Sequence, residues 1–213
     1  MPARSLKMGA GSALTVLILG LAYGATLIGG LLSLQSAADP IGDPWFTLLE
    51  VLIVALAPAL VVLFACIHGR AAPAHKPLAL AALAFISITA TLTSVLHFTI
   101  LTLGRTAQYA ALIRADGPLA FRWPSFAYAI DILAWDVFFA LAVLSAAPAF
   151  GGDRLGLAVR WSLIAAGVLA LGGLAGVPTG DMGLRNIGIL GYGVVLPIAA
   201  GPMALLFRRE ARA

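Results

Sequence analysis

Charged side chains are scarce in this sequence, and that scarcity excludes a water-soluble globular protein. Only 10% of the 213 residues are Asp, Glu, Lys or Arg, and 62% are hydrophobic. The mean hydropathy is +1.03. Soluble domains carry about 25% charged residues, because a hydrated surface needs them. The composition therefore predicts an integral membrane protein.

Cysteine and histidine are also rare, which limits the metal and haem sites that can form. Cys66 is the single cysteine, so an intrachain disulfide or a site with several thiolate ligands cannot form. Glu50, His97 and Asp131 supply mixed carboxylate and imidazole donors, but no motif with the spacing of metal ligands accompanies them. His97 is the only histidine inside a predicted span, which disfavours haem held by two histidines. We expect no metal and no cofactor.

Several sequence features of soluble enzymes and nucleic-acid-binding proteins are missing. The thirteen Lys and Arg exceed the nine Asp and Glu by four, and they are spread over loops and termini instead of forming a basic stripe. We therefore expect no nucleic acid as a partner, and the anionic headgroups of membrane lipids are the simpler one. There is no G-x-S-x-G motif and no phosphate-binding glycine loop, which argues against serine hydrolases and nucleotide-dependent enzymes.

Long apolar runs, in contrast, are abundant. A helix needs about 20 apolar residues to cross the hydrocarbon core, and breaks rich in Pro, Gly and charge separate runs of this length. The first run follows Arg4 and Lys7, as in a signal peptide, but it is longer than a signal core and is predicted to be a retained helix. The sequence predicts an all-α bundle of six transmembrane helices, a single domain over 1–213, with spans at 13–34, 47–67, 78–103, 125–149, 156–176 and 186–207.

The distribution of Lys and Arg predicts the orientation. Loops on the cytoplasmic side carry an excess of these residues. If the N-terminus is cytoplasmic, only Arg105, Arg114, Arg122 and Arg185 fall on the opposite side. We therefore expect both termini in the cytoplasm and a multi-pass protein of the plasma or inner membrane.

Small residues spaced four apart indicate close helix packing. Gly20 and Gly24 share a face of the first span, and Gly172 and Gly176 share a face of the fifth. Such pairs let two helices approach closely, either within one chain or between two copies. The sequence favours packing within the chain and leaves a homodimer open.

Ionisable residues inside the spans gather toward one leaflet. With the predicted orientation, Glu50, His97, Asp131 and Asp136 all lie between mid-depth and the extracytoplasmic surface. Each aspartate would cost roughly 2.5–3.5 kcal/mol at the centre of an isolated helix, so these groups must face one another or water. The pattern predicts a polar pocket that opens to the extracytoplasmic side and is lined by the second, third, fourth and sixth helices.

Helical spacing orients the fourth span. Tyr128, Asp131, Trp135 and Phe138 fall on one face of an α-helix. Asp136 is turned about 140° from Asp131, so the two carboxylates need not share one partner. On the third helix, Thr93 precedes His97 by four residues and extends the polar face.

The candidate residues fall into two groups. We predict catalytic roles for Asp131, Asp136, His97 and Glu50. We predict pocket or substrate-binding roles for Trp135, Tyr128, Phe138, Thr93, Trp45, Trp123, Arg122, Arg185 and Asn186.

Each candidate also has a structural interpretation. Asp136 can be a buried acid bonded to His97, to Thr93 or to the backbone, and Glu50 can be a solvated residue at a helix start. His97 can be a hydrogen-bonded packing element. Trp45 and Trp123 lie where interfacial aromatic belts occur, and the spacing of Asp181 and Arg185 predicts an ion pair within one helix.

Carboxylates and aromatic rings in an apolar pocket suit acid–base chemistry. Neighbouring titratable groups supply a proton donor and an acceptor together, and ring faces stabilise positive charge. The preferred hypothesis is an isomerase or cyclase acting on a lipophilic molecule that enters from the bilayer. A proton-coupled transporter or sensor of a small molecule is the first alternative, and a structural subunit of a membrane complex is the second.

Overall fold

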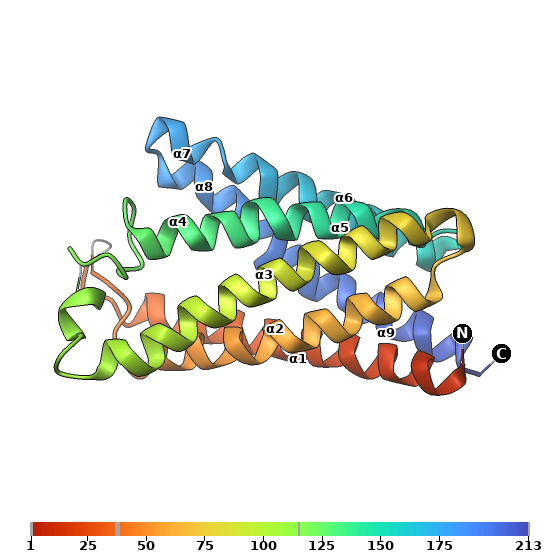
Figure 1. The fold of residues 1–213 in the computed structure, drawn as a ribbon, viewed down its shortest axis with the longest axis horizontal. Coiled ribbons are helices and arrows are strands. Elements are labelled where there is room, and N and C mark those ends of the chain that lie inside the picture. Colours follow the sequence, from red (N-terminus) through yellow and green to blue (C-terminus); the bar gives the residue numbers. More distant parts are fainter. Residues whose placement is uncertain (1, 37–38, 115, 213) are drawn as a thin grey trace.

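The computed structural model describes residues 2–36, 39–114 and 116–212, and this part of the chain is helical without strands. It contains six helices that are long and apolar enough to cross a membrane: Ala3–Leu32, Trp45–Arg70, Pro73–Arg105, Phe126–Ala149, Arg154–Thr179 and Met182–Glu210. The chain is therefore a polytopic membrane protein, as its composition predicts. Both termini lie at one end of the bundle (Figure 1). The cytoplasmic location of that end stays a prediction.

The first three spans are nearly regular. They comprise α1 (Ala3–Leu32), α2 (Trp45–Arg70), and α3 (Lys76–Thr102) with the short turns η1 (Pro73–His75) and η2 (Leu103–Arg105) at its ends. The first span begins ten residues before its predicted start at residue 13. Its polar first turns are helical because they pack on the last helix, where Gly9 lies against the ring of Phe207.

The last three spans are built from shorter pieces. The fourth span contains α4 (Phe126–Ile132), the π-helical turn η4 (Leu133–Phe139), α5 (Ala140–Ala146) and η5 (Ala147–Ala149). The fifth contains α6 (Arg154–Gly173) and α7 (Gly176–Thr179). The sixth contains α8 (Met182–Ile189), the π-helical turn η6 (Leu190–Val195) and α9 (Leu196–Glu210). The loop before α4 also holds the short turn η3 (Ala110–Ile113).

The sixth span crosses the bundle and joins its two sides. The helix pairs α1–α2 and α2–α3 pack in chain order, while α8 packs on α6 and α9 packs on α1. Figure 1 shows this diagonal path, from α8 beside α6 to α9 beside α1. Because of this crossing, α4 and α8 face α2 and α3 in the half of the bundle away from the termini, which we call the distal half.

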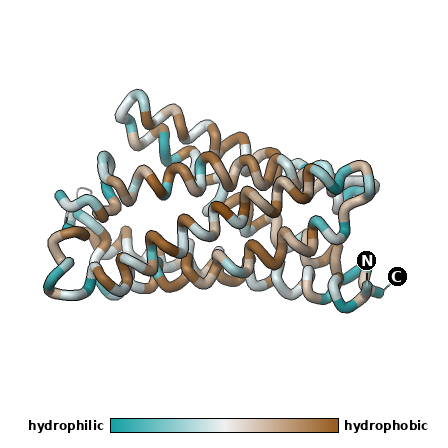
Figure 2. Tube along the Cα trace, in the orientation of Figure 1, coloured by the Kyte–Doolittle hydropathy of each residue, from teal (hydrophilic) through white to brown (hydrophobic). Residues whose placement is uncertain are grey.

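The half of the bundle near the termini has an apolar interior. Hydrophobic residues run along the middle of the bundle, and hydrophilic residues gather at its two ends (Figure 2). The fully buried side chains include Phe64, Phe139, Phe150, Leu163, Met203 and Phe207. Large apolar side chains such as Val95, Trp161 and Ile198 are more than half exposed, as expected for a surface that contacts lipid.

Glycine contacts confirm close helix packing at some of the predicted positions. A side chain at Gly20 would overlap Pro197, and one at Gly176 would overlap Arg185. Gly24 has no neighbour within 4 Å, and Gly172 has only Ile187, at 3.9 Å. Packing within the chain therefore uses one member of each pair, and the homodimer stays a prediction.

An ion-pair clasp closes the bundle near the termini. The Arg70 guanidinium donates to Glu210 at 2.7–3.0 Å and to the carbonyl of Ala149 at 2.7 Å. It also lies 5.1 Å from the centre of the Phe150 ring. These contacts join the second, fourth and sixth spans.

A second clasp lies at the distal surface. Arg105 and Thr47 both hydrogen-bond to the carboxylate of Asp43. The hydrogen bonds from Arg105 are the main reason that the pKa of Asp43 lies well below its ordinary value. This clasp joins the starts of α2 and of the α3–α4 loop.

We predict that Arg70→Ala destabilises the protein by about 2 kcal/mol, because it removes several charge-assisted hydrogen bonds. Glu210→Gln should cost less, since Arg70 keeps its bond to Ala149. Thermal unfolding in detergent measures both effects, and Arg212→Ala, at an exposed position, is the control. Equal melting temperatures for all three variants would contradict the clasp.

We predict that the stabilisation of the protein by the Asp43–Arg105 pair is complete above about pH 4 and is lost progressively in more acidic solution. The folded-state pKa of Asp43 is lowered, so its contribution is present above the ordinary carboxyl pKa near 3.9 and disappears as the pH falls through the folded-state value. The pair is partly exposed, so Asp43→Asn should cost less than about 1 kcal/mol at pH 7. The cost should shrink in unfolding experiments at lower pH, and Asp116→Asn, at an exposed position of the loop before α4, is the control. A cost independent of pH would refute this reasoning.

Candidate functional site

Five ionisable side chains form a continuous buried chain in the distal half, which we call the polar cluster. His97 Nδ1 lies 2.9 Å from Glu50 Oε2, and His97 Nε2 lies 3.7 Å from Asp131 Oδ1. Arg185 Nη2 donates to Asp131 Oδ2 at 2.8 Å. Arg185 Nε lies 3.4 Å from Asp136 Oδ2. The cluster therefore links α2, α3, α4, η4 and α8.

The polar cluster is closed to solvent. The side chains of Glu50, His97 and Arg185 are 3–4% exposed, Asp131 is 10% exposed and Asp136 is 0% exposed. The four residues predicted as catalytic thus lie together, with groups from the second, third, fourth and sixth helices. The interpretation of Glu50 as a solvated helix-start residue is wrong, because it lies against His97.

A π-helical turn lets both aspartates reach one partner. In an α-helix, Asp131 and Asp136 would point about 140° apart. The fourth span widens at η4, where the hydrogen bonds run from residue i to i+5. Residues five apart then lie closer to one face, so both carboxylates meet Arg185. Asp136 does not hydrogen-bond to His97 or Thr93, and its Oδ1 lies against Gly188, where a side chain would overlap it.

The structure also corrects the partner of Arg185. The spacing of Asp181 and Arg185 predicts a pair within one helix, but Asp181 caps α8 by accepting from the amide of Gly183 at 2.8 Å. This cap leaves the Arg185 guanidinium free to extend into the bundle. There the deeper carboxylates of Asp131 and Asp136 outcompete the exposed Asp181, because buried charges require a partner.

Aromatic rings surround the guanidinium. Arg185 lies 4.9 Å from the ring centre of Tyr128 and 5.9 Å from that of Tyr192. Trp135 packs on Tyr192 at 5.1 Å and on Phe139 at 5.6 Å. These rings extend the site from the polar cluster toward the middle of the bundle.

Tyr192 was missed by the sequence analysis. It stands in the apolar stretch GILGYG, residues 188–193. Its position seven residues after Arg185 places both on one face of a helix, and that spacing was the available signal.

Phe138 does not join the site. It pairs with Phe85 at 6.4 Å on another face of the helix, and Phe139 takes the place predicted for it. The same π-helical turn explains this shift, because it changes the face on which later residues lie.

The other predicted pocket residues lie at the distal margin. Trp123 contacts Tyr128 at 6.5 Å between ring centres. Trp45 lies against Gly29 of α1, outside the polar cluster. Arg122 and Asn186 are exposed. Trp123 therefore borders the site, whereas the structure does not bring Trp45, Arg122 or Asn186 to it.

Phe121 covers the imidazole on the distal side. Its ring lies 5.2 Å from that of His97 and 6.2 Å from that of Tyr128. Phe121 is 37% exposed, whereas His97 is 2% exposed. The loop before α4 thus separates the polar cluster from the distal surface.

Several polar atoms at this site are buried without a hydrogen bond. In the described part of the chain, all such side-chain atoms come from the polar cluster and its neighbours: Thr93 Oγ1, His97 Nε2, Trp135 Nε1, both Asp136 oxygens, Arg185 Nε and Tyr192 Oη. A buried polar group left unpaired costs about 1–3 kcal/mol. Their concentration indicates a place for water or for a ligand.

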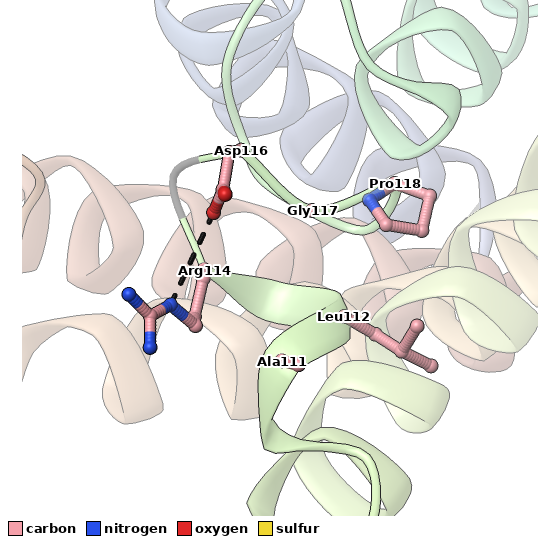
Figure 3. A pocket seen from close by; sticks show the side chains of 6 residues that line it. All are labelled: Ala111, Leu112, Arg114, Asp116, Gly117 and Pro118. Atoms are coloured by element: carbon pink, nitrogen blue, oxygen red, sulfur yellow. Dashed lines mark ion pairs between the residues drawn. The ribbon is translucent and has the colours of Figure 1, made fainter.

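We also searched the described residues for metal-ligand groups and surface hollows outside the polar cluster. The described residues contain no group of three or more His, Cys, Asp or Glu side chains arranged for a metal ion. A surface hollow lies in the loop before α4, and Figure 3 shows its exposed pair, Arg114 and Asp116, 4.0 Å apart. Another is lined by Leu31, Leu34, Gln35 and Ser36. Neither hollow contains a residue of the polar cluster.

We predict that Arg185→Ala destabilises the protein by about 3–5 kcal/mol, because it leaves two buried carboxylates without their cation. Adding Asp136→Asn should restore part of the loss, since one uncompensated charge is removed. Thermal unfolding in detergent measures both variants, and Arg122→Ala is the exposed control. If Arg185→Ala and Arg122→Ala melt alike, the ion pairs do not stabilise the fold.

Comparisons of this chain with protein-family models, with curated proteins and with solved structures find no match.

Proposed function

We propose that this membrane protein is an acid–base enzyme that rearranges a lipophilic substrate, as an isomerase or cyclase does. The observation that carries the proposal is that two titratable side chains have buried polar atoms without a hydrogen bond. His97 Nε2 and both oxygens of Asp136 are buried without a hydrogen bond. A catalytic acid or base must come within hydrogen-bond reach of the substrate, and these atoms have no protein hydrogen bond that competes with such a contact.

Charge balance supports simultaneous acid and base roles. With the three carboxylates ionised, His97 neutral and Arg185 protonated, the polar cluster has a net charge of −2. Two protons therefore neutralise it, and a buried site in lipid favours neutrality. Those protons are shared among four groups: Glu50, His97, Asp131 and Asp136. A neutral cluster thus contains protonated and unprotonated members together, which general acid–base catalysis requires.

The contacts suggest how the roles divide. Glu50 holds His97 through Nδ1, in the way that a carboxylate orients an imidazole in catalytic triads. His97 Nε2 makes no hydrogen bond and lies 3.7 Å from Asp131 Oδ1. Asp131 and Arg185 connect His97 to Asp136. We assign His97 and Asp136 as the catalytic residues and Glu50, Asp131 and Arg185 as positioning residues. One catalytic group takes a proton from the substrate and the other returns one to a different atom, so the composition of the substrate is unchanged.

The surroundings fit a lipophilic substrate. The rings of Tyr128 and Tyr192 flank the Arg185 guanidinium, and Trp135 packs on Tyr192. Their ring faces stabilise a developing positive charge, and the absence of bulk water strengthens electrostatic interactions at the reacting atoms. A molecule dissolved in the bilayer would reach this site without crossing water.

The distribution of buried polar residues disfavours transport. Among the described residues, the buried charged side chains are Glu50, His97, Asp131, Asp136 and Arg185, and all lie in the distal half. A proton or cation pathway needs polar groups toward both faces of the membrane. A purely structural role remains the rival, and the proton exchange experiment separates it from catalysis.

We predict that the protein labels its substrate with deuterium in heavy water. A rearrangement by protonation and deprotonation places a solvent-derived proton on carbon, so mass spectrometry of a total lipid extract incubated with the protein in nanodiscs should show a lipid that gains mass. His97→Gln and Asp136→Asn should lower the labelling rate by at least about 100-fold, the usual contribution of a general acid or base.

Matched variants control this experiment. His75→Gln and Asp116→Asn replace the same residue types outside the polar cluster and should label at the wild-type rate. Melting temperatures identify any variant that fails to fold. The absence of labelling by the wild type, or equal labelling by folded His97→Gln and Asp136→Asn variants, would refute the enzyme hypothesis.

A further inference from the structure

We infer that the end of the bundle that holds both termini binds the headgroups of anionic membrane lipids. The surface concerned, which we call the basic face, consists of six exposed cations: Arg4, Lys7, Lys76, Arg154, Arg208 and Arg212. They come from the starts of α1, α3 and α6, from the end of α9 and from the residues that follow it. The inference does not depend on the proposed reaction, because none of these residues belongs to the polar cluster.

The carboxylates at this end of the bundle are already paired with other cations. Glu210 accepts hydrogen bonds from Arg70, and Asp153 lies 2.5 Å from Arg209. The remaining Asp and Glu residues belong to the distal loops, the start of α8 and the polar cluster. In the part of the chain that the structure describes, the basic face therefore has no carboxylate left to neutralise it.

Three cations of the basic face stand where the helix itself disfavours them. The amino end of a helix carries a partial positive charge, which attracts acids and repels cations. Arg4 and Lys76 nevertheless lie in the first turns of α1 and α3, which contain no acidic residue. Arg154 is the first residue of α6. These positions do not stabilise the helices, whereas a negatively charged surface outside the protein accounts for them.

The basic face lies at the depth of lipid headgroups. Hydrophobic residues fill the middle of the bundle, and hydrophilic residues mark its ends (Figure 2). Trp161 is 64% exposed and lies roughly 10 Å along α6 from Arg154. Tryptophan is enriched at the boundary between hydrocarbon and headgroups. The cation at the start of α6 is therefore level with lipid phosphates.

An anionic phospholipid fits this surface better than a zwitterionic one. A phosphate supplies acceptor oxygens and negative charge to guanidinium and ammonium groups. In phosphatidylcholine the choline cation offsets the charge of the phosphate, whereas phosphatidylglycerol keeps a net negative charge. Because the basic face has an excess of positive charge, it selects the anionic headgroup.

The distal surface does not have this excess of positive charge. Arg105 pairs there with Asp43, and Arg114 lies 4.0 Å from Asp116. Among the described residues of the distal loops, Arg122 is the remaining exposed cation. We therefore expect anionic lipids to collect at one end of the bundle, and Arg114 and Arg122 serve as controls.

The test titrates the detergent-solubilised protein with dioleoyl-phosphatidylglycerol or with dioleoyl-phosphatidylcholine. The two lipids have the same acyl chains and differ in the headgroup. Native mass spectrometry counts the bound lipids and gives a Kd for each lipid. The wild type should bind phosphatidylglycerol more tightly than phosphatidylcholine, and this preference is the readout.

Two matched double variants locate the preference. Arg4→Gln with Lys76→Gln should raise the Kd for phosphatidylglycerol by about five-fold per charge, the usual contribution of one Lys or Arg near an anionic membrane surface. The Kd for phosphatidylcholine should change little. Arg114→Gln with Arg122→Gln should keep the wild-type preference. Because the helix dipole disfavours Arg4 and Lys76, their replacement should not lower the melting temperature of the lipid-free protein.

Several results would overturn the inference. They are equal binding of the two lipids by the wild type, an unchanged preference after Arg4→Gln with Lys76→Gln, and an equal loss of preference in the distal variant. A lower melting temperature of lipid-free Arg4→Gln with Lys76→Gln would also overturn it, because these cations would then stabilise the fold itself. Binding of poly-glutamate without a preference for phosphatidylglycerol would assign the basic face to an acidic protein instead.

Discussion

Arg185 is the group on which the distal half of the bundle depends. Its guanidinium is buried and lies against the carboxylates of Asp131 and Asp136, so the fourth and sixth spans are joined by opposite charges. In lipid none of these three charges would be tolerated alone. Each charge offsets the free-energy cost of burying the other two, which explains how so apolar a chain holds both aspartates in one helix. His97 lies against Asp131, and Glu50 lies against His97. The polar cluster therefore forms because buried charges need partners.

The transmembrane helices were predictable from the sequence, because a lipid environment requires them. Each of the six spans was predicted from the length of its apolar run, because backbone groups in hydrocarbon must be satisfied within a helix. The convergence of Glu50, His97, Asp131 and Asp136 followed from the same constraint, since lipid cannot solvate them. The start of α1 was predicted too late, because its first turns are stabilised by packing on α9, which a hydropathy run does not report.

The details that tertiary structure dictates were not predictable. The α-helical period turns Asp136 about 140° from Asp131 and places Phe138 in the site. At η4, however, both carboxylates reach Arg185, and Phe138 packs on Phe85. No residue pattern marks a π-helical turn strongly. Its formation depends on the contacts that the widened turn makes with neighbouring helices. The choice of Arg185 between Asp181 and the two buried aspartates likewise depends on burial, which sequence spacing does not reveal.

The one-sided placement of charge constrains what this protein can do. The half near the termini is packed with Phe64, Phe150, Phe207 and other apolar side chains, and the buried charged side chains of the described residues all lie in the distal half. In the proposed catalysis, protons therefore move among members of the polar cluster and a bound molecule. Transport needs a second route, whereas catalysis on a molecule held at the cluster needs none. Phe121 lies over His97 at the distal margin, with ring centres 5.2 Å apart, so the loop before α4 separates the imidazole of the polar cluster from the distal surface.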